Sequence, residues 1–151
     1  MNKLLLILLA VVFIGCSNSD DNNETPALTT TEISRGDLYG AGDEGIEESR
    51  LLITNVADWN ALKNSMDSVN PVSGGFTETT IDFQNYDVIA IFDEIKGYGG
   101  YTIAIDEIIE NEDNYIVSIV HTAPSGFATT VITQPYHIYK IPKATKPVIF
   151  I

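Results

Sequence analysis

The sequence predicts a mainly β fold, namely an antiparallel sandwich or barrel-like domain of six to eight strands with one short helix. Runs of β-branched and aromatic residues recur along the chain, separated by clusters of Gly, Pro, Asn and Asp. A helical pattern is present in one segment, which follows Asn55. Beyond a polar N-terminal stretch, about 120 residues remain, which is enough for one domain with a single core.

Residues 1–15 have the pattern of a signal peptide. The apolar run 4–14 follows Lys3 and is shorter than the roughly 20 residues that a membrane-spanning helix needs. The run ends in Phe13-Ile-Gly-Cys16, which resembles the lipobox of bacterial lipoproteins, with phenylalanine where leucine is more common. We therefore expect Cys16 to be the lipid attachment site, with an ordinary secretory cleavage site as the alternative. Cys16 is the only cysteine, so the domain has no internal disulfide.

Residues 16–31 are expected to be a lipidated flexible tether, and residues 32–151 a folded domain. The tether is polar and acidic, and such a composition cannot bury enough apolar surface to offset its ordering entropy. Its acidic cluster also resembles the export signal of some bacterial surface lipoproteins, although a solvated spacer explains it equally well. The expected location is the bacterial outer membrane, lipid-anchored on the periplasmic or cell-surface side.

The first part of the domain predicts two strands and the helix. A strand from Ile33 leads into a turn at residues 40–45, and residues 46–54 form a second strand. Asn55 then acts as an N-cap with Asp58 as its reciprocal partner. The residues at helical spacing are Val56, Trp59, Leu62 and Met66, which predicts a buried stripe with Trp59 as its anchor. The alternative role for Trp59 is a ligand platform.

Residues 87–121 predict three adjacent strands in a meander. Two apolar arms flank the glycine-rich stretch 95–101, and a second reversal at residues 110–114 leads into Tyr115. We expect positive φ where the chain reverses at Gly97, Gly99 and Gly100. Before this region Phe83 is the expected buried residue. After it, prolines bracket the run 136–141, which suits an edge strand or a strand bounded at both ends.

Charge and motifs exclude several classes of function. The net charge of −13 repels phosphate backbones, so no nucleic acid partner is expected. The sequence contains no serine-nucleophile elbow, phosphate-binding loop before a helix, or His-Glu-x-x-His pattern. His121 and His137 with a carboxylate are a conceivable zinc set, and the acidic runs a conceivable calcium set, but none has the spacing of a known site. We expect no enzyme activity, no cofactor and no metal.

Two loops combine glycine with aromatic residues, a composition common in binding surfaces. The alternative is a tight turn whose tyrosines pack back on the sheet. The expected partner-binding residues are Lys96, Gly97, Tyr98, Gly99, Gly100, Tyr101, Pro124, Ser125, Gly126 and Phe127.

Several segments together resemble the PrcB C-terminal-like domain family. They are Trp59 on its short helix, Pro71, Ile81-Asp-Phe83, Lys96-Gly-Tyr-Gly-Gly-Tyr101 and Gln134-Pro-Tyr-His-Ile-Tyr-Lys-Ile-Pro142. The family is named for a lipoprotein subunit that associates with and stabilises a bacterial surface protease complex. The resemblance covers residues 51–143 and carries over no catalytic residue.

The expected function is a non-catalytic, membrane-anchored binding subunit that docks onto and stabilises an exported protease or similar surface protein. The expected partners are that protein and, through the N-terminal lipid, the membrane. Two alternatives come from other classes: a surface module that binds peptide or glycan, and a hydrolase that uses His121, His137 and a nearby aspartate.

Overall fold

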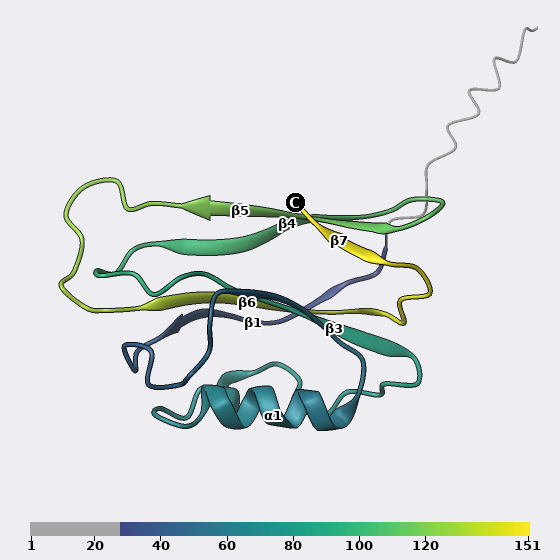
Figure 1. Ribbon diagram of the computed structural model, residues 1–151, viewed down its shortest axis with the longest axis horizontal. Coiled ribbons are helices and arrows are strands. Elements are labelled where there is room, and N and C mark those ends of the chain that lie inside the picture. The colour runs from purple at the N-terminus through teal and green to yellow at the C-terminus, as the bar shows by residue number, and fades with distance from the viewer. Residues whose placement is uncertain (1–27) are drawn as a thin grey trace, which may run out of the picture.

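The computed structural model describes residues 28–151, which form two β-sheets and one α-helix stacked in three layers (Figure 1). The signal peptide, Cys16 and most of the tether predicted from the sequence lie outside these residues. The strands are β1 (Thr31–Leu38), β2 (Ser49–Ile53), β3 (Tyr86–Phe92), β4 (Thr102–Glu110), β5 (Tyr115–Thr122), β6 (Gln134–Pro142) and β7 (Val148–Phe150). The helix is α1 (Val56–Met66), and a 3₁₀ turn, η1, spans Ser73–Gly75.

The two sheets form a sandwich and do not close into a barrel. The larger sheet has the strand order β1-β6-β3-β2, and the smaller has the order β4-β5-β7. All pairs are antiparallel except β5 with β7, which run parallel. The mainly β prediction with one short helix is therefore confirmed. Among the described residues, no helix is long and apolar enough to span a bilayer.

The predicted meander over residues 87–121 is wrong in its first half. β4 and β5 pair as the predicted hairpin, but β3 pairs with β2 and β6 in the other sheet. Residues 93–101 therefore cross from one sheet to the other instead of making a tight turn. The reason lies in the run Val88–Phe92, which is buried throughout because one face meets the helix layer and the other meets the smaller sheet.

The helix begins and ends where its local signals predict. The Asn55 side chain accepts a hydrogen bond from the Asp58 amide and donates one to the Asp58 carboxylate. Trp59 is 1 % exposed, and its indole N–H donates to the Thr79 carbonyl. Val56 departs from the prediction, since it is the first residue of the helix and is mostly exposed.

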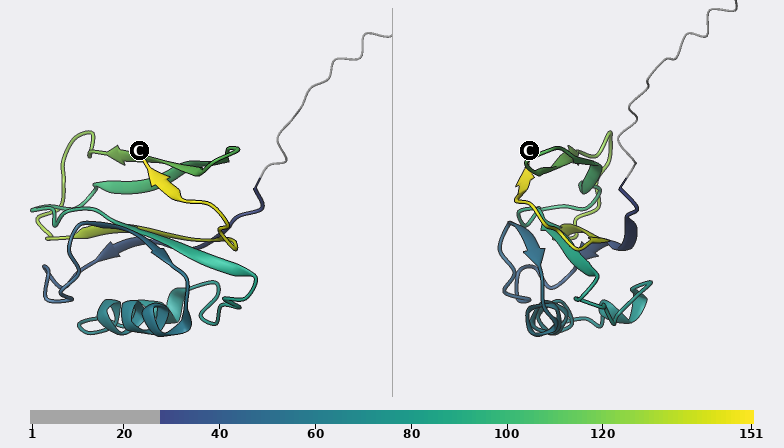
Figure 2. Two further views of the ribbon diagram at one scale, coloured as in Figure 1. Left: turned by 45° about the vertical axis from the view of Figure 1, so that its right-hand side comes forward. Right: turned by 90° about the vertical axis from the view of Figure 1, so that its right-hand side faces the viewer.

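Two cores hold the three layers together (Figure 2). The first lies between the helix layer and the larger sheet, where Trp59, Leu62 and Met66 meet the side chains of that sheet. The second lies between the sheets, where Ile89 and Ile91 meet Ile103. Phe83, predicted to be buried, is partly buried against the first core, and its neighbour Ile81 is the more deeply buried residue.

Of the two alternatives for residues 136–141, a strand bounded at both ends is correct and an edge strand is not. β6 lies between β1 and β3. Its two prolines, Pro135 and Pro142, stand at its ends, where the missing N–H removes the fewest ladder bonds.

Candidate functional site

The two loops predicted to bind a partner lie side by side at one end of the sandwich. The Gly99 amide donates to the Thr129 carbonyl at 3.0 Å, and Lys96 and Thr133 exchange two backbone hydrogen bonds. In Figure 1 these loops, 93–101 and 123–133, lie at the left end, together with the turn after β1. Although these paired residues are 30 and 37 positions apart in sequence, the loops therefore form one surface.

The glycines of this surface have different roles. Gly100 adopts φ +92°, and a Cβ there would lie 3.0 Å from the Pro124 Cβ. Gly99 does not adopt a positive φ, but a Cβ would lie 2.5 Å from the Thr129 hydroxyl. Gly97 has neither constraint, so the expectation of positive φ at Gly97 and Gly99 is wrong. Close packing of the second loop explains Gly99 instead.

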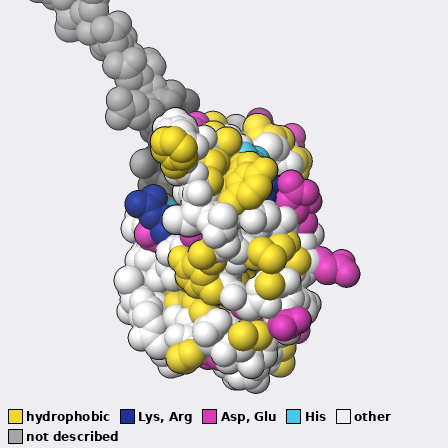
Figure 3. Space-filling view, turned by 90° about the vertical axis from the view of Figure 1, so that its left-hand side faces the viewer, with side chains coloured by type: hydrophobic (Ala, Val, Ile, Leu, Met, Phe, Trp, Pro, Cys, Tyr) yellow, Lys and Arg dark blue, Asp and Glu magenta, His cyan; other side chains and the backbone are white. Residues whose placement is uncertain are grey.

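Large apolar side chains are exposed across this end, which Figure 3 views directly. Tyr98 is 51 % exposed and Phe127 is fully exposed. The sequence did not single out the others, because Tyr39, Ile95, Val131 and Ile132 occupy ordinary turn or loop positions. We call the set the loop face: Tyr39, Ile95, Tyr98, Phe127, Val131 and Ile132. An exposed apolar group of this kind is typical of an interaction surface.

Lys96 and Tyr101 belong to the scaffold of the loop. The Lys96 ammonium lies 3.1 Å from Asp93 and 3.0 Å from Glu94, and 5.1 Å from the Tyr101 ring centroid. Burial alone would lower the pKa of Lys96, but its hydrogen bonds to both carboxylates hold that pKa above the ordinary value. Tyr101 in turn lies against Tyr98, with ring centroids 6.0 Å apart. These contacts present Tyr98 on an ordered loop.

Asp93 anchors the base of the same loop. Its carboxylate accepts hydrogen bonds from the Glu94 amide at 2.8 Å and from Lys96, and it lies 3.2 Å from His121 Nδ1. Burial opposes ionisation, but these bonds outweigh it and hold the pKa of Asp93 below 3.8. The cluster joins the larger sheet to β5 and so fixes the loop relative to both sheets.

The two histidines occupy separate environments. His137 is 2 % exposed, and its Nδ1 accepts the Ile105 amide at 3.0 Å, so Nε2 bears the proton and donates to Glu32 at 3.0 Å. Burial holds the pKa of His137 below 6.5. His121 is half exposed and bonds to Asp93 instead. No hydrogen bond among the described residues joins the two rings, and no group of three or more His, Cys, Asp or Glu side chains in residues 28–151 is arranged to hold a metal.

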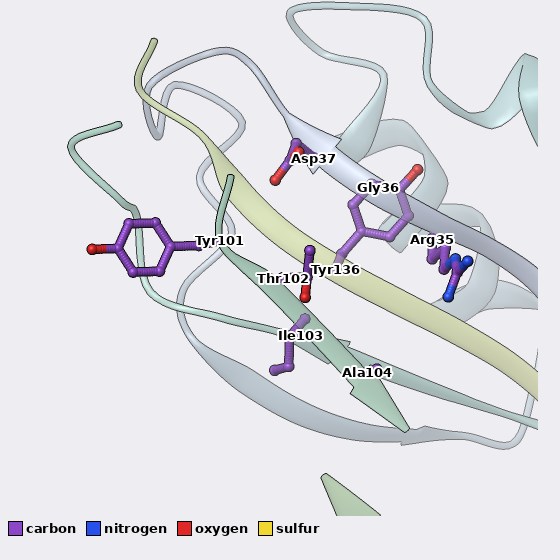
Figure 4. Close-up of a pocket in the computed structure, with 8 residues that line it drawn as sticks. All are labelled: Arg35, Gly36, Asp37, Tyr101, Thr102, Ile103, Ala104 and Tyr136. Carbon is purple, nitrogen blue, oxygen red and sulfur yellow. The ribbon is translucent and has the colours of Figure 1, made fainter. Parts of the chain in front are cut away.

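Two cavities adjoin the loop face. One, of about 420 Å³, lies between the turn after β1 and Ile95, and it is lined by Gln134 and by the acidic side chains of Glu47, Glu48 and Glu94. Glu48 and Glu94 are already paired with Arg50 and Lys96. The other, of about 360 Å³, opens between β1 and β4 and contains Asp37 (Figure 4).

The fold and this surface define an antiparallel β-sandwich domain with an aromatic loop face. Residues 88–142 match the family model described as PrcB C-terminal. This stretch, from β3 to the end of β6, is therefore similar to the PrcB C-terminal family, as the sequence resemblance indicated. It contains both loops, while α1 and Trp59 lie outside it. No curated protein and no solved structure matches the chain significantly.

Proposed function

We propose that this protein is a non-catalytic, membrane-anchored subunit that docks onto an exported protease, or a similar surface protein, and stabilises it. The family match supports association with a protease complex, since that is the role after which the family is named. The observation that carries the proposal is the loop face, where two loops of the matched stretch present aromatic side chains to solvent on an ordered scaffold.

The direction of the chain supports anchoring at the opposite end. β1 starts at Thr31, which is paired with Lys140, and ends at Leu38, which is paired with Gln134 beside the loop face. At about 3.3 Å per residue, these two ends of β1 are roughly 23 Å apart. A tether from Cys16 would join the domain at Thr31, so the loop face would lie at the end of the domain farther from the attachment of the tether.

The exposure of Tyr98 and Phe127 supports a role for these side chains in binding a partner and not in folding. The Phe127 side chain is fully exposed among the described residues, and burying such a side chain is worth roughly 1.5 to 3 kcal/mol. Aromatic anchors of this kind dominate the energetics of protein interfaces. A glycan-binding module would use the same side chains, and oligosaccharide competition separates the two functions.

The geometry of His137 does not support the hydrolase alternative. Both of its ring nitrogens are engaged in hydrogen bonds, and the ring is inaccessible to a substrate. The hypothesis required His121 and His137 to act together, but the two rings bond to different carboxylates.

Cross-linked capture from native membranes tests the proposal. The wild-type chain should recover a protease subunit, Phe127→Ala should recover at least tenfold less, and Tyr86→Ala should recover the wild-type amount. Tyr86 is a matched control because it is an exposed aromatic at the far end of β3. The protease should also be degraded faster in cells that lack this chain. Equal recovery by all three chains, or a protease with an unchanged half-life, would contradict the proposal.

Membrane anchoring has its own test. Cys16→Ala should abolish labelling by a radioactive fatty acid, because the thiol is the attachment atom for the diacylglyceryl group. A label that persists on the variant would refute the lipoprotein assignment.

A further inference from the structure

The cavity around Asp37 lies between the edges of the two sheets. β1 is an edge strand of the larger sheet, and β4 is an edge strand of the smaller. The cavity is lined by Arg35, Gly36, Asp37, Tyr101, Thr102, Ile103, Ala104 and Tyr136. Its volume of about 360 Å³ is at the lower end of the range for ligand pockets, which suits one long side chain. Tyr101 connects it to the loop face.

Asp37 has a carboxylate oxygen with no hydrogen-bond partner. Its Oδ1 is buried and receives no bond, and burial raises the pKa of Asp37 above 3.8. By contrast, each of the two most buried aspartates of the described chain has a lysine partner. Asp87 lies 2.6 Å from the Lys143 ammonium and accepts the Ala144 amide, and Asp93 is paired with Lys96. Within the described residues, Asp37 therefore keeps a buried hydrogen-bond acceptor without a donor.

Arg35, the cation nearest to Asp37 along the strand, does not fill that role. Its guanidinium lies 3.9 Å from Glu32, its side chain is mostly exposed, and it forms no ion pair with Asp37. Figure 4 shows Arg35 and Asp37 apart from each other at the cavity, with the Tyr136 ring between them. The space beside the Asp37 carboxylate is therefore open to a cation from outside.

Residues of β4 form one wall of the cavity. The Ile105 amide donates to His137, so it points away from β5 and toward the gap between the sheets. Because alternate residues of an antiparallel strand direct their N–H and C=O groups to the same side, Ile103 faces the same gap. The Ile105 amide is already bonded to His137 and Ile103 is 3 % exposed, so this edge takes no further strand, and the cavity itself is the place for an incoming side chain.

We propose that the Asp37 cavity receives the lysine or arginine side chain of an extended segment of the docked partner. This proposal rests on the proposed function in one respect, namely that the segment belongs to a protein partner. The charge of the chain fits a basic occupant, since its net charge is −13. A charged donor of this kind makes a strong, short hydrogen bond to a carboxylate.

The test uses the full chain labelled with ¹⁵N and two peptides of defined sequence, acetyl-Gly-Ser-Lys-Ser-Gly-amide and the same peptide with norleucine for lysine. The lysine peptide should shift the amide resonances of Thr102, Ile103 and Ala104 and should bind at least tenfold tighter than the norleucine peptide. The Asp37→Asn variant should lose this preference. Asp106→Asn removes the same charge but should keep the preference for lysine, because Asp106 is exposed on β4 and does not line the cavity.

Each other outcome overturns the inference. Equal binding of the two peptides, or no shift at millimolar peptide, would show that the cavity does not select a cation. An equal loss in Asp106→Asn would indicate attraction to the overall charge. n-Butylammonium should bind at least tenfold weaker than the lysine peptide, and equal binding would make this a small-amine site. Unfolding of Asp37→Asn at the wild-type midpoint excludes a folding defect. None of these results depends on capture through Phe127, so the two proposals can fail separately.

Discussion

The aromatic residues of the helix layer and of the loop face have opposite environments. In the helix layer, Trp59 is buried, stacks on Phe76 with centroids 5.9 Å apart and satisfies its N–H with a backbone carbonyl. On the loop face, Tyr98 and Phe127 extend into solvent from loops that are held by hydrogen bonds and glycine packing. The first environment stabilises the fold. The second leaves apolar side chains available to a partner. Folding and binding therefore depend on different aromatic residues, and substitutions can test the two roles separately.

Trp59→Ala should have the largest effect on stability, a loss of about 3 to 5 kcal/mol in the free energy of unfolding, because the truncation leaves a cavity beneath the helix. Val56→Ala on the same helix is the matched control and should change stability by less than about 0.5 kcal/mol, since Val56 is mostly exposed. Denaturant unfolding measures both. A loss below about 1 kcal/mol at Trp59 would remove the helix layer from the stabilising core.

Asp93 joins the two environments, and its effect should depend on pH. The pKa of Asp93 is lowered in the folded state, so its ionised form stabilises the fold at pH values above the ordinary 3.8 and this contribution is lost as the pH falls through the folded-state pKa. The free energy of unfolding of the wild type should therefore exceed that of Asp93→Asn by about 1 to 3 kcal/mol at neutral pH. The difference should shrink on acidification below about pH 4. A difference that is independent of pH would show that the charge of Asp93 does not hold the loop.

Gly100→Ala should cost about 1 to 2 kcal/mol, because the left-handed backbone disfavours a Cβ and the added atom would press on Pro124. Gly97→Ala is the control in the same loop. It has an ordinary φ and open space, so it should be neutral or stabilising by up to about 1 kcal/mol through the unfolded chain. Thermal unfolding of the two variants decides this, and equal midpoints would refute the assigned conformation of the turn.

Local signals in the sequence predicted the helix and the positions of the two loops, but not that residues 93–101 connect the two sheets. Asn55 and Asp58 are three residues apart and cap the helix whatever the rest of the chain does, so its start could be predicted. The glycine-aromatic composition likewise singled out the two loops, although nothing in the sequence showed that Gly99 and Thr129 would meet.

Long-range pairing caused the errors. β3 and β4 are adjacent in sequence and both contain several isoleucines, but burial of Val88–Phe92 on both faces placed β3 inside the larger sheet. For the same reason β6 is internal despite its prolines. The Asp37 cavity was missed because Asp37 lies in an unremarkable strand, and its significance depends on β4 and β6.

Tyr98→Ala, measured twice on the same preparation, is the most direct test of the separation between folding and binding. The free energy of unfolding should change by less than about 0.5 kcal/mol, since Tyr98 is half exposed at a loop tip. The affinity for the captured partner should fall by about 2 kcal/mol, or roughly thirtyfold. Tyr86→Ala should leave that affinity unchanged. Lost stability with unchanged affinity for the partner would contradict the account and return Tyr98 to the structural core.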